Sequence, residues 1–265
     1  MNVNFGEISN AGIDLSLSGQ IIRTRDWFWS VTLTGGHVMD KIRHISSSMK
    51  GVEVDNKDDA KKPKILFEEG GSQFDIYAMR SAGIDPATGR EIYIKRNGDY
   101  TFTYDPDERV AVGNTNPALQ GSLMTTLRWK NLSVTLNSTY TFGADYYNST
   151  IQSKVEDVDP YKNLDKRALY DRWKSPGDHS RYLSIDSRET THYSERFVEK
   201  RNELYISGIQ FMYDFRPALL ARVGMKKLAV GIGFTDIAHI STVKFERGTS
   251  YPYCRSFSLT FRPTF

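Results

Sequence analysis

The sequence predicts an all-β fold, in which about seven long antiparallel strands form part of a transmembrane β-barrel wall with long loops on one side. Three observations predict it. Apolar and polar residues alternate with the two-residue period of a strand in several runs. Short and very long connections follow one another in turn. The last strand-like run ends on Phe265, with the apolar residues of the run on one side and mostly small hydroxyl residues on the other.

The alternating runs occur in a clear order along the chain. The expected strands are 12–21, 27–36, 117–129, 132–143, 203–215, 228–237 and 253–265. In the second run, for example, Trp27, Trp29, Val31 and Leu33 share one face. The last run alternates in the same way from Tyr253 to Phe265. Aromatic residues make up 12% of the chain, which also favours β-structure.

The connections are of two kinds. Those after the first, third and fifth runs are short or modest: residues 23–26, 130–131 and 216–227. Those after the second and fourth runs are very long, at about 39–116 and 147–200. Short turns at one end and long loops at the other are typical of outer-membrane barrels. The first long loop also contains turn signals at 85–89 and 97–98 between strand-like runs, so we expect small hairpins there, and a charged stretch at 52–64.

The composition excludes several functional classes. The 35 basic and 32 acidic residues are too evenly balanced to predict a nucleic-acid-binding protein. A single cysteine, Cys254, permits no internal disulfide. No run approaches the roughly 18 apolar residues that a membrane helix needs, a test that barrel strands escape because alternation lowers their hydropathy.

No catalytic, cofactor or metal motif is recognisable. The glycines at 231 and 233 lie inside a strand without a following helix, so they predict close strand packing and not a phosphate loop. The five histidines show no metal-ligand spacing, and no GxSxG sequence marks a nucleophile. We therefore expect no enzyme, no cofactor and no metal site.

The long loops carry many aromatic side chains with polar tips. Such rings suit sugar, peptide or protein recognition, although they also pack loops internally. We select Tyr170, Trp173 and Tyr182 as candidate contacts with a ligand or partner. Tyr146, Tyr147 and Tyr213 are candidates for the aromatic girdles at the edges of a barrel.

Several segments, in order, resemble the SusC/RagA-like TonB-linked outer-membrane transporters of Bacteroidetes. They are FGEISNAGIDLSLSG, YAMRSAGIDPATGREIY, VGNTNPALQGSLMTTLRWKNLSVTLNSTYTFG, KRALYDRWKSPGD, SERFVEKRNELYISGIQFMYDF and the strand that ends in Phe265. The resemblance covers nearly the whole chain. It implies the C-terminal part of a 22-strand barrel, located in the cell outer membrane and in contact with its lipid.

The resemblance also implies a function and partners. Such transporters import glycan or peptide fragments, work with a SusD-like surface lipoprotein above the long loops, and are powered by the TonB complex through an N-terminal part. Phe265 would then be the C-terminal signal read by the barrel-assembly machinery. The family's export signal, plug and TonB box are not recognised in this sequence, so we expect a fragment of an incomplete barrel.

Two other interpretations remain open at this point. A soluble, all-β carbohydrate-binding module would have the same alternation, with the apolar strand faces meeting in a dry core. An enzyme on a β-scaffold would require a pocket of convergent carboxylates with perturbed pKa values.

Overall fold

The computed structural model describes residues 6–45, 67–158, 161, 164–184, 186–187, 190–220, 224–244 and 255–265. The charged stretch at 52–64 and the beginning of the last predicted run, with Tyr253 and Cys254, lie outside these residues. The chain divides into two compact units. One comprises residues 1–11, 39–116 and 144–200, and the other comprises residues 12–38, 117–143 and 201–265.

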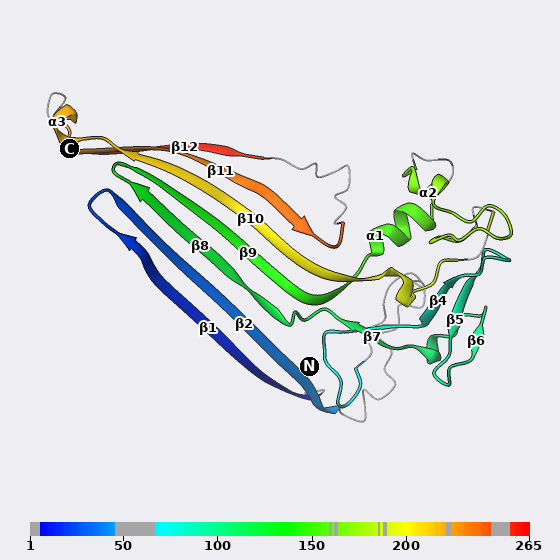
Figure 1. The fold of residues 1–265 in the computed structure, drawn as a ribbon. Helices are drawn as coiled ribbons and strands as arrows, with labels where there is room; N and C mark the ends of the chain where they lie inside the picture. The colour runs from blue at the N-terminus through cyan, green and yellow to red at the C-terminus, as the bar shows by residue number, and fades with distance from the viewer. Residues whose placement is uncertain are drawn as a thin grey trace, which may run out of the picture. The chain divides into compact units, whose positions relative to one another are not determined.

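A seven-stranded antiparallel sheet contains all seven predicted strands, as Figure 1 shows. Its order along the sheet is β1-β2-β8-β9-β10-β11-β12. The strands are β1 (Gly6–Arg23), β2 (Trp27–Ile45), β8 (Leu119–Trp129), β9 (Leu132–Tyr147), β10 (Val198–Asp214), β11 (Lys227–Ser241) and β12 (Phe257–Thr264). β1 and β12 end the sheet, so within the described residues it is open.

The register places the apolar residues of neighbouring strands on one face. Trp27 pairs with Trp129, and Leu33 pairs with Leu123. Toward the β12 edge of the sheet, Ile232 of β11 pairs with both Phe211 of β10 and Leu259 of β12. Because side chains alternate along every strand, these pairs make one continuous apolar face.

This apolar face is exposed, and no second layer among the described residues packs against it. Ile13, Leu259 and Phe261 are 78%, 62% and 65% exposed. Among the described residues of the unit 12–38, 117–143 and 201–265, the buried hydrophobic residues are only Leu220 and Val243. The dry core that a soluble sandwich requires is therefore not found in this part of the chain.

At two positions in the sheet, lack of space for a side chain explains why the residue is glycine. Gly121 lies opposite Tyr140, whose hydroxyl donates a hydrogen bond to the Thr34 carbonyl at 2.7 Å. A Cβ at Gly121 would lie 1.9 Å from that carbonyl oxygen and 2.7 Å from the Tyr140 hydroxyl. At Gly231 a Cβ would lie 2.1 Å from the sulfur of Met212, which confirms the predicted need for room.

The unit formed by the long loops has small sheets and short helices of its own. The predicted turns at 85–89 and 97–98 do join hairpin strands, in the sheet β4-β5-β6. A second sheet, β3-β7, pairs segments about 35 residues apart and was not predicted. The elements are β3 (Asp75–Ala78), β4 (Arg80–Ile84), β5 (Glu91–Ile94), β6 (Tyr100–Thr101), β7 (Val110–Asn114), α1 (Ser149–Ile151), α2 (Arg167–Tyr170) and the single turns at Pro106–Glu108, Gln152–Glu156 and Glu195–Phe197. The remaining helix, α3 (Pro217–Leu220), lies between β10 and β11 in the other unit.

The hydrophobic core of this unit consists largely of loop residues. One cluster contains Ile151, Val155, Tyr182 and Phe197. A second contains Ile76, Ala78 and Tyr193. Tyr147 packs against both clusters and stacks on Tyr193 with ring centroids 3.7 Å apart. The interpretation of Tyr147 as a girdle residue was therefore wrong, because its ring belongs to the core of the loops.

No helix in the described part of the chain is long and apolar enough to cross a membrane.

Candidate functional site

The two long loops fold together around the segment that leads into β10. Met79, in the first loop, forms an isolated bridge with Ser194 in the second. The amide of Glu195 donates to the Met79 carbonyl at 3.0 Å. Both residues of the bridge are fully buried, so the loops share one interior.

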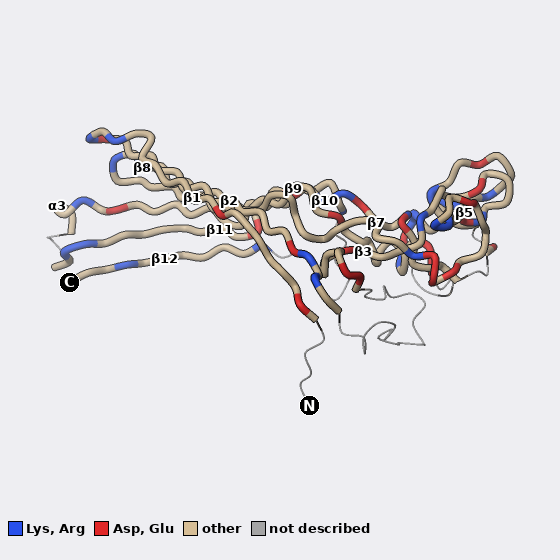
Figure 2. Tube along the Cα trace, turned by 90° about the horizontal axis from the view of Figure 1, so that it is seen from below, with Lys and Arg blue, Asp and Glu red and all other residues tan. Residues whose placement is uncertain are grey.

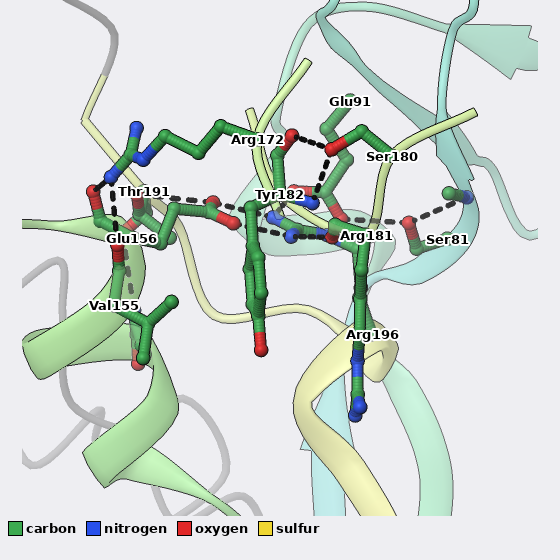
Figure 3. Close-up of polar contacts among 12 residues, drawn as sticks. Ser81, Glu91, Val155, Glu156, Arg172, Ser180, Arg181, Tyr182, Thr191 and Arg196 are labelled. Atoms are coloured by element: carbon green, nitrogen blue, oxygen red, sulfur yellow. Dashed lines mark hydrogen bonds and ion pairs between the residues drawn. The ribbon is translucent and has the colours of Figure 1, made fainter. Parts of the chain in front are cut away.

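A buried ion network lies at this junction (Figure 3). The Arg196 guanidinium donates to Glu156 of the second loop, with Nη2 2.6 Å from Oε1, and to Glu91 of the first loop at 2.9 Å. The side chains of Arg196, Glu91 and Glu156 are 7%, 2% and 0% exposed. Burial by itself would lower the pKa of Arg196, but the hydrogen bond to Glu156 and the charge of Glu91 raise it above its ordinary value. Arg196 therefore stays charged and joins the two loops.

Arg172 extends the network toward the surface. Its Nη2 donates to the carbonyl of Val155 at 2.9 Å and also to the carbonyl of Glu156. Burial lowers the pKa of Arg172. Its buried Nε has no hydrogen-bond partner among the described residues.

A groove of about 490 Å³ opens beside Arg172. Its lining combines one exposed aromatic ring with charged and hydroxyl groups. The lining residues are Tyr170, Asp171, Arg172, Lys174, Asp178, His179, Ser180 and Arg181. All of them come from the second long loop, within a single stretch of twelve residues.

The charges of the groove are partly neutralised within the protein. The amides of Ser175 and Lys174 donate to Asp178 at 2.9 and 3.0 Å, which holds the pKa of that carboxyl below its ordinary value. Arg181 forms an ion pair with Glu199 at 2.6 Å. The Lys174 ammonium lies 5.9 Å from the centre of the Tyr170 ring. A ring beside a cation suits a ligand with a flat apolar face and acceptor groups, such as a sugar or a peptide.

The three candidate contact residues lie in different environments. Tyr170 is 66% exposed and lines the groove. Trp173 donates its indole N–H to the Pro86 carbonyl at 2.8 Å, and its ring lies 2.6 Å from where a Cβ of Gly89 would be. Tyr182 is 3% exposed and packs in the core. Tyr170 is therefore free to touch a ligand, Trp173 is half-buried between the two loops, and Tyr182 is enclosed in the core.

Three other loop tyrosines follow the packing alternative and one does not. Tyr77, Tyr93 and Tyr193 are buried, whereas Tyr100 is exposed. Burial raises the pKa of Tyr93 far above its ordinary value.

Phe265, the candidate assembly signal, follows β12 directly and is 74% exposed. Its position continues the outward face of Phe257, Leu259 and Phe261.

Sequence reasoning missed the ion network. Glu91 and Arg196 are 105 positions apart, and Glu156 and Arg196 are 40 apart, so no local pattern marks them as partners. In the described part of the chain no group of three His, Cys, Asp or Glu residues could hold a metal ion.

The comparisons with known proteins agree with this fold. No family model matches the sequence. A TonB-dependent receptor of Formosa agariphila is 20% identical over 288 residues, which cover 89% of this chain and 27% of the receptor. The named relatives are receptors and transporters.

Solved structures are similar over most of the chain. The RagAB peptide transporter matches with a TM-score of 0.76 and 18% identity, covering 91% of this chain and 26% of that chain. The RagAB peptide importer in its open-open and closed-closed states matches with a TM-score of 0.71 in both cases, at 17% and 18% identity. These matches cover 91% of this chain and 26% and 27% of the solved chains.

The chain spans about a quarter of the length of these relatives. Its open, antiparallel sheet is that of a partial barrel. The predicted resemblance is confirmed: the chain is similar in sequence to a TonB-dependent receptor and has the fold of one part of the RagAB peptide transporter.

Proposed function

We propose that this chain is part of the wall and outer loops of an outer-membrane nutrient importer of the TonB-dependent type. The observation that carries the proposal is the exposed apolar face of the seven-stranded sheet. A face of this kind is stable in water only when something apolar covers it, and lipid is the cover that a barrel wall uses.

The height of the apolar face fits a bilayer. On β8, Leu119 and Trp129 mark its two ends, and the strand has 11 residues. At about 3.4 Å per residue and a tilt of about 45°, such a strand covers about 25 Å along the membrane normal. That is the height of the apolar band of outer-membrane barrels.

The imported substrate would be a glycan or peptide fragment. The resemblance to a TonB-dependent receptor and to the RagAB peptide transporter supports import, and the groove at Tyr170 supports a ligand with apolar and acceptor groups. The loops 39–116 and 147–200 would face the outside of the cell, below a SusD-like lipoprotein. Energy from the TonB complex would enter through another part of the protein, and Phe265 would be read by the barrel-assembly machinery.

Cell fractionation tests the location. An antibody against residues 164–184 should detect the protein in the outer-membrane fraction of its native organism. A signal confined to the soluble fraction would contradict the proposal and would favour the soluble carbohydrate-binding module instead.

Uptake by the intact protein tests the groove. Tyr170→Ala should raise the KM for the transported oligosaccharide or peptide by about tenfold, because stacking on one exposed ring contributes about 1 kcal/mol or more. Tyr100→Ala is the matched control, since Tyr100 is equally exposed in the same unit but outside the groove. Equal KM values in the two variants would remove Tyr170 from the binding site.

A further inference from the structure

The short turns of the sheet lie together at one end and are joined by backbone hydrogen bonds (Figure 1). The amide of Lys130 donates to the Asp26 carbonyl at 2.7 Å, which joins the first turn to the second. The amide of Asp214 donates to the Asn131 carbonyl at 2.9 Å, which joins the second turn to the end of β10, just before the third. The amide of Lys226 donates to the Thr264 carbonyl at 2.7 Å, so the last strand ends at the same level.

This end of the sheet carries an excess of positive charge (Figure 2). Eight exposed cationic residues occur here, against two acidic residues, Asp26 and Asp214. We call the cationic set the short-turn rim. It consists of Arg23, Arg25, Arg128, Lys130, Arg216, Lys226, Lys227 and Arg262. No ion pair within the described residues involves any of them.

Aromatic rings lie beside the short-turn rim. Trp27 and Trp129 have ring centroids 5.9 Å apart, and the Lys130 ammonium lies 5.4 Å from the Trp129 ring. Tyr213, a predicted girdle residue, and Phe215 form a second pair at 5.1 Å. Trp and Tyr rings favour the boundary between lipid tails and headgroups, so the cations beyond them would lie at headgroup level in a bilayer.

We propose that the short-turn rim binds the headgroups of anionic phospholipids in the leaflet that faces the short turns. This inference rests on the proposed function, because it requires the apolar face to be in a bilayer. Lys and Arg side chains near a membrane surface attract anionic headgroups. The cations of the turns, Arg23, Arg25, Lys130, Arg216 and Lys226, continue the aromatic belt and the apolar wall, and have no carboxylate partner among the described residues. They fit phosphate headgroups whose acyl chains lie along that wall, whereas Arg128, Lys227 and Arg262 lie on the polar face of their strands.

The opposite ends of the same strands are different. There the acidic side chains Glu203 and Asp236 contact neighbours, with Glu203 2.7 Å from His239 and Asp236 bonded to the Tyr205 hydroxyl. Because this end carries both acidic and basic side chains that contact one another, it should attract anionic headgroups less than the short-turn rim does. The two ends therefore provide a matched comparison within one sheet.

Lipid that remains bound to the purified protein tests the inference. The complete protein that contains this chain is extracted from outer membranes in mild detergent, and bound phosphatidylglycerol, cardiolipin and phosphatidylethanolamine are quantified by mass spectrometry. The variant carries Lys130→Gln with Lys226→Gln. The control carries Lys244→Gln with Arg255→Gln, which removes two cations from the other end of the sheet.

The expected result is a loss of about tenfold in the ratio of anionic phospholipid to phosphatidylethanolamine for the first variant, and no change for the control. An unchanged ratio in the first variant overturns the inference, as does an equal loss in both. Release of the lipid by millimolar inorganic phosphate, or retention of lipopolysaccharide or peptidoglycan instead of phospholipid, also overturns it. A protein that is not found in the outer membrane at all contradicts the proposed function itself, and this is seen before any lipid is measured.

Discussion

The guanidinium of Arg196 holds two carboxylates that come from different long loops. Because all three side chains are almost fully buried, removal of the cation leaves two uncompensated negative charges in the interior. Water cannot reach these two charges unless the core around Phe197 opens.

We therefore expect Arg196→Met to destabilise the loop unit by about 3–5 kcal/mol. Hydrogen exchange of the segments 76–94 and 147–158 in the intact protein measures this loss. Arg181→Gln is the control, because its ion pair with Glu199 is partly exposed and contributes about 1 kcal/mol or less. Exchange rates that change equally in the two variants would show that Arg196 does not hold the loops together.

Tyr77 gives the loop unit a dependence on alkaline pH. Burial, with the nearby charges of Glu68 and Asp75, raises the pKa of Tyr77 to about 12 from its ordinary value of 10.0. The folded state thus favours the neutral phenol. Its contribution to stability is fully present below pH 10 and is lost as the pH rises from 10 to about 12.

The loop unit should accordingly become less stable between pH 10 and 12, in step with ionisation of the phenol. Tyrosinate absorbance and hydrogen exchange, recorded in parallel, measure both events. Tyr77→Phe should make the loss of stability less steep in this range, whereas Tyr100→Phe, at an exposed position, should leave it unchanged. An identical pH profile for the Tyr77 variant would contradict this assignment.

The strands could be predicted from sequence where their two faces meet different surroundings. Alternation marks β8 and β12 because one face is apolar and the other polar. The same pattern fades in residues 39–45 of β2 and 198–202 of β10, where the sequence is mostly polar or charged, so these extensions were missed.

The loop elements were predictable only where a turn is local. The turns at 85–89 and 97–98 have Gly89 and Gly98 at positive φ, as their residues indicate. The pairing of β3 with β7 and the contacts of Arg196 depend on residues that are far apart in sequence, so no short pattern encodes them. Among the candidate contacts, the sequence could not show that Tyr182 is buried and Tyr170 is exposed, because both are aromatic loop residues.

The last strand provides a test of which face meets lipid. Phe261 lies on the exposed apolar face opposite Val230, whereas Thr260 lies on the other face opposite Gly231. Phe261 adjoins Arg262 of the short-turn rim, so Phe261→Arg should cost about 1–2 kcal/mol, less than at the middle of the apolar band, and reduce outer-membrane assembly. Thr260→Arg should be tolerated, because a polar side chain on that face meets water. Heat-modifiable mobility on gels measures assembly, and equal loss in both variants would contradict the assignment of the faces.

The sheet as a whole has two free edges in the described part of the chain, β1 and β12. An unpaired backbone group in the hydrocarbon region costs several kcal/mol, so an open sheet is not stable in a bilayer unless other strands pair with its edges. Because this chain covers 26% of the RagAB chain that it matches, we propose that strands outside it pair with these edges. We expect this chain, when refolded alone into vesicles, to give no monomeric heat-modifiable species, whereas the complete protein gives one.

Cross-linking through cysteines placed on β1 and β12 distinguishes the two ways in which the prediction can fail. A cross-link between the two strands of one chain would mean that the seven strands close on themselves, and a cross-link between chains would mean that the edges pair with a second copy.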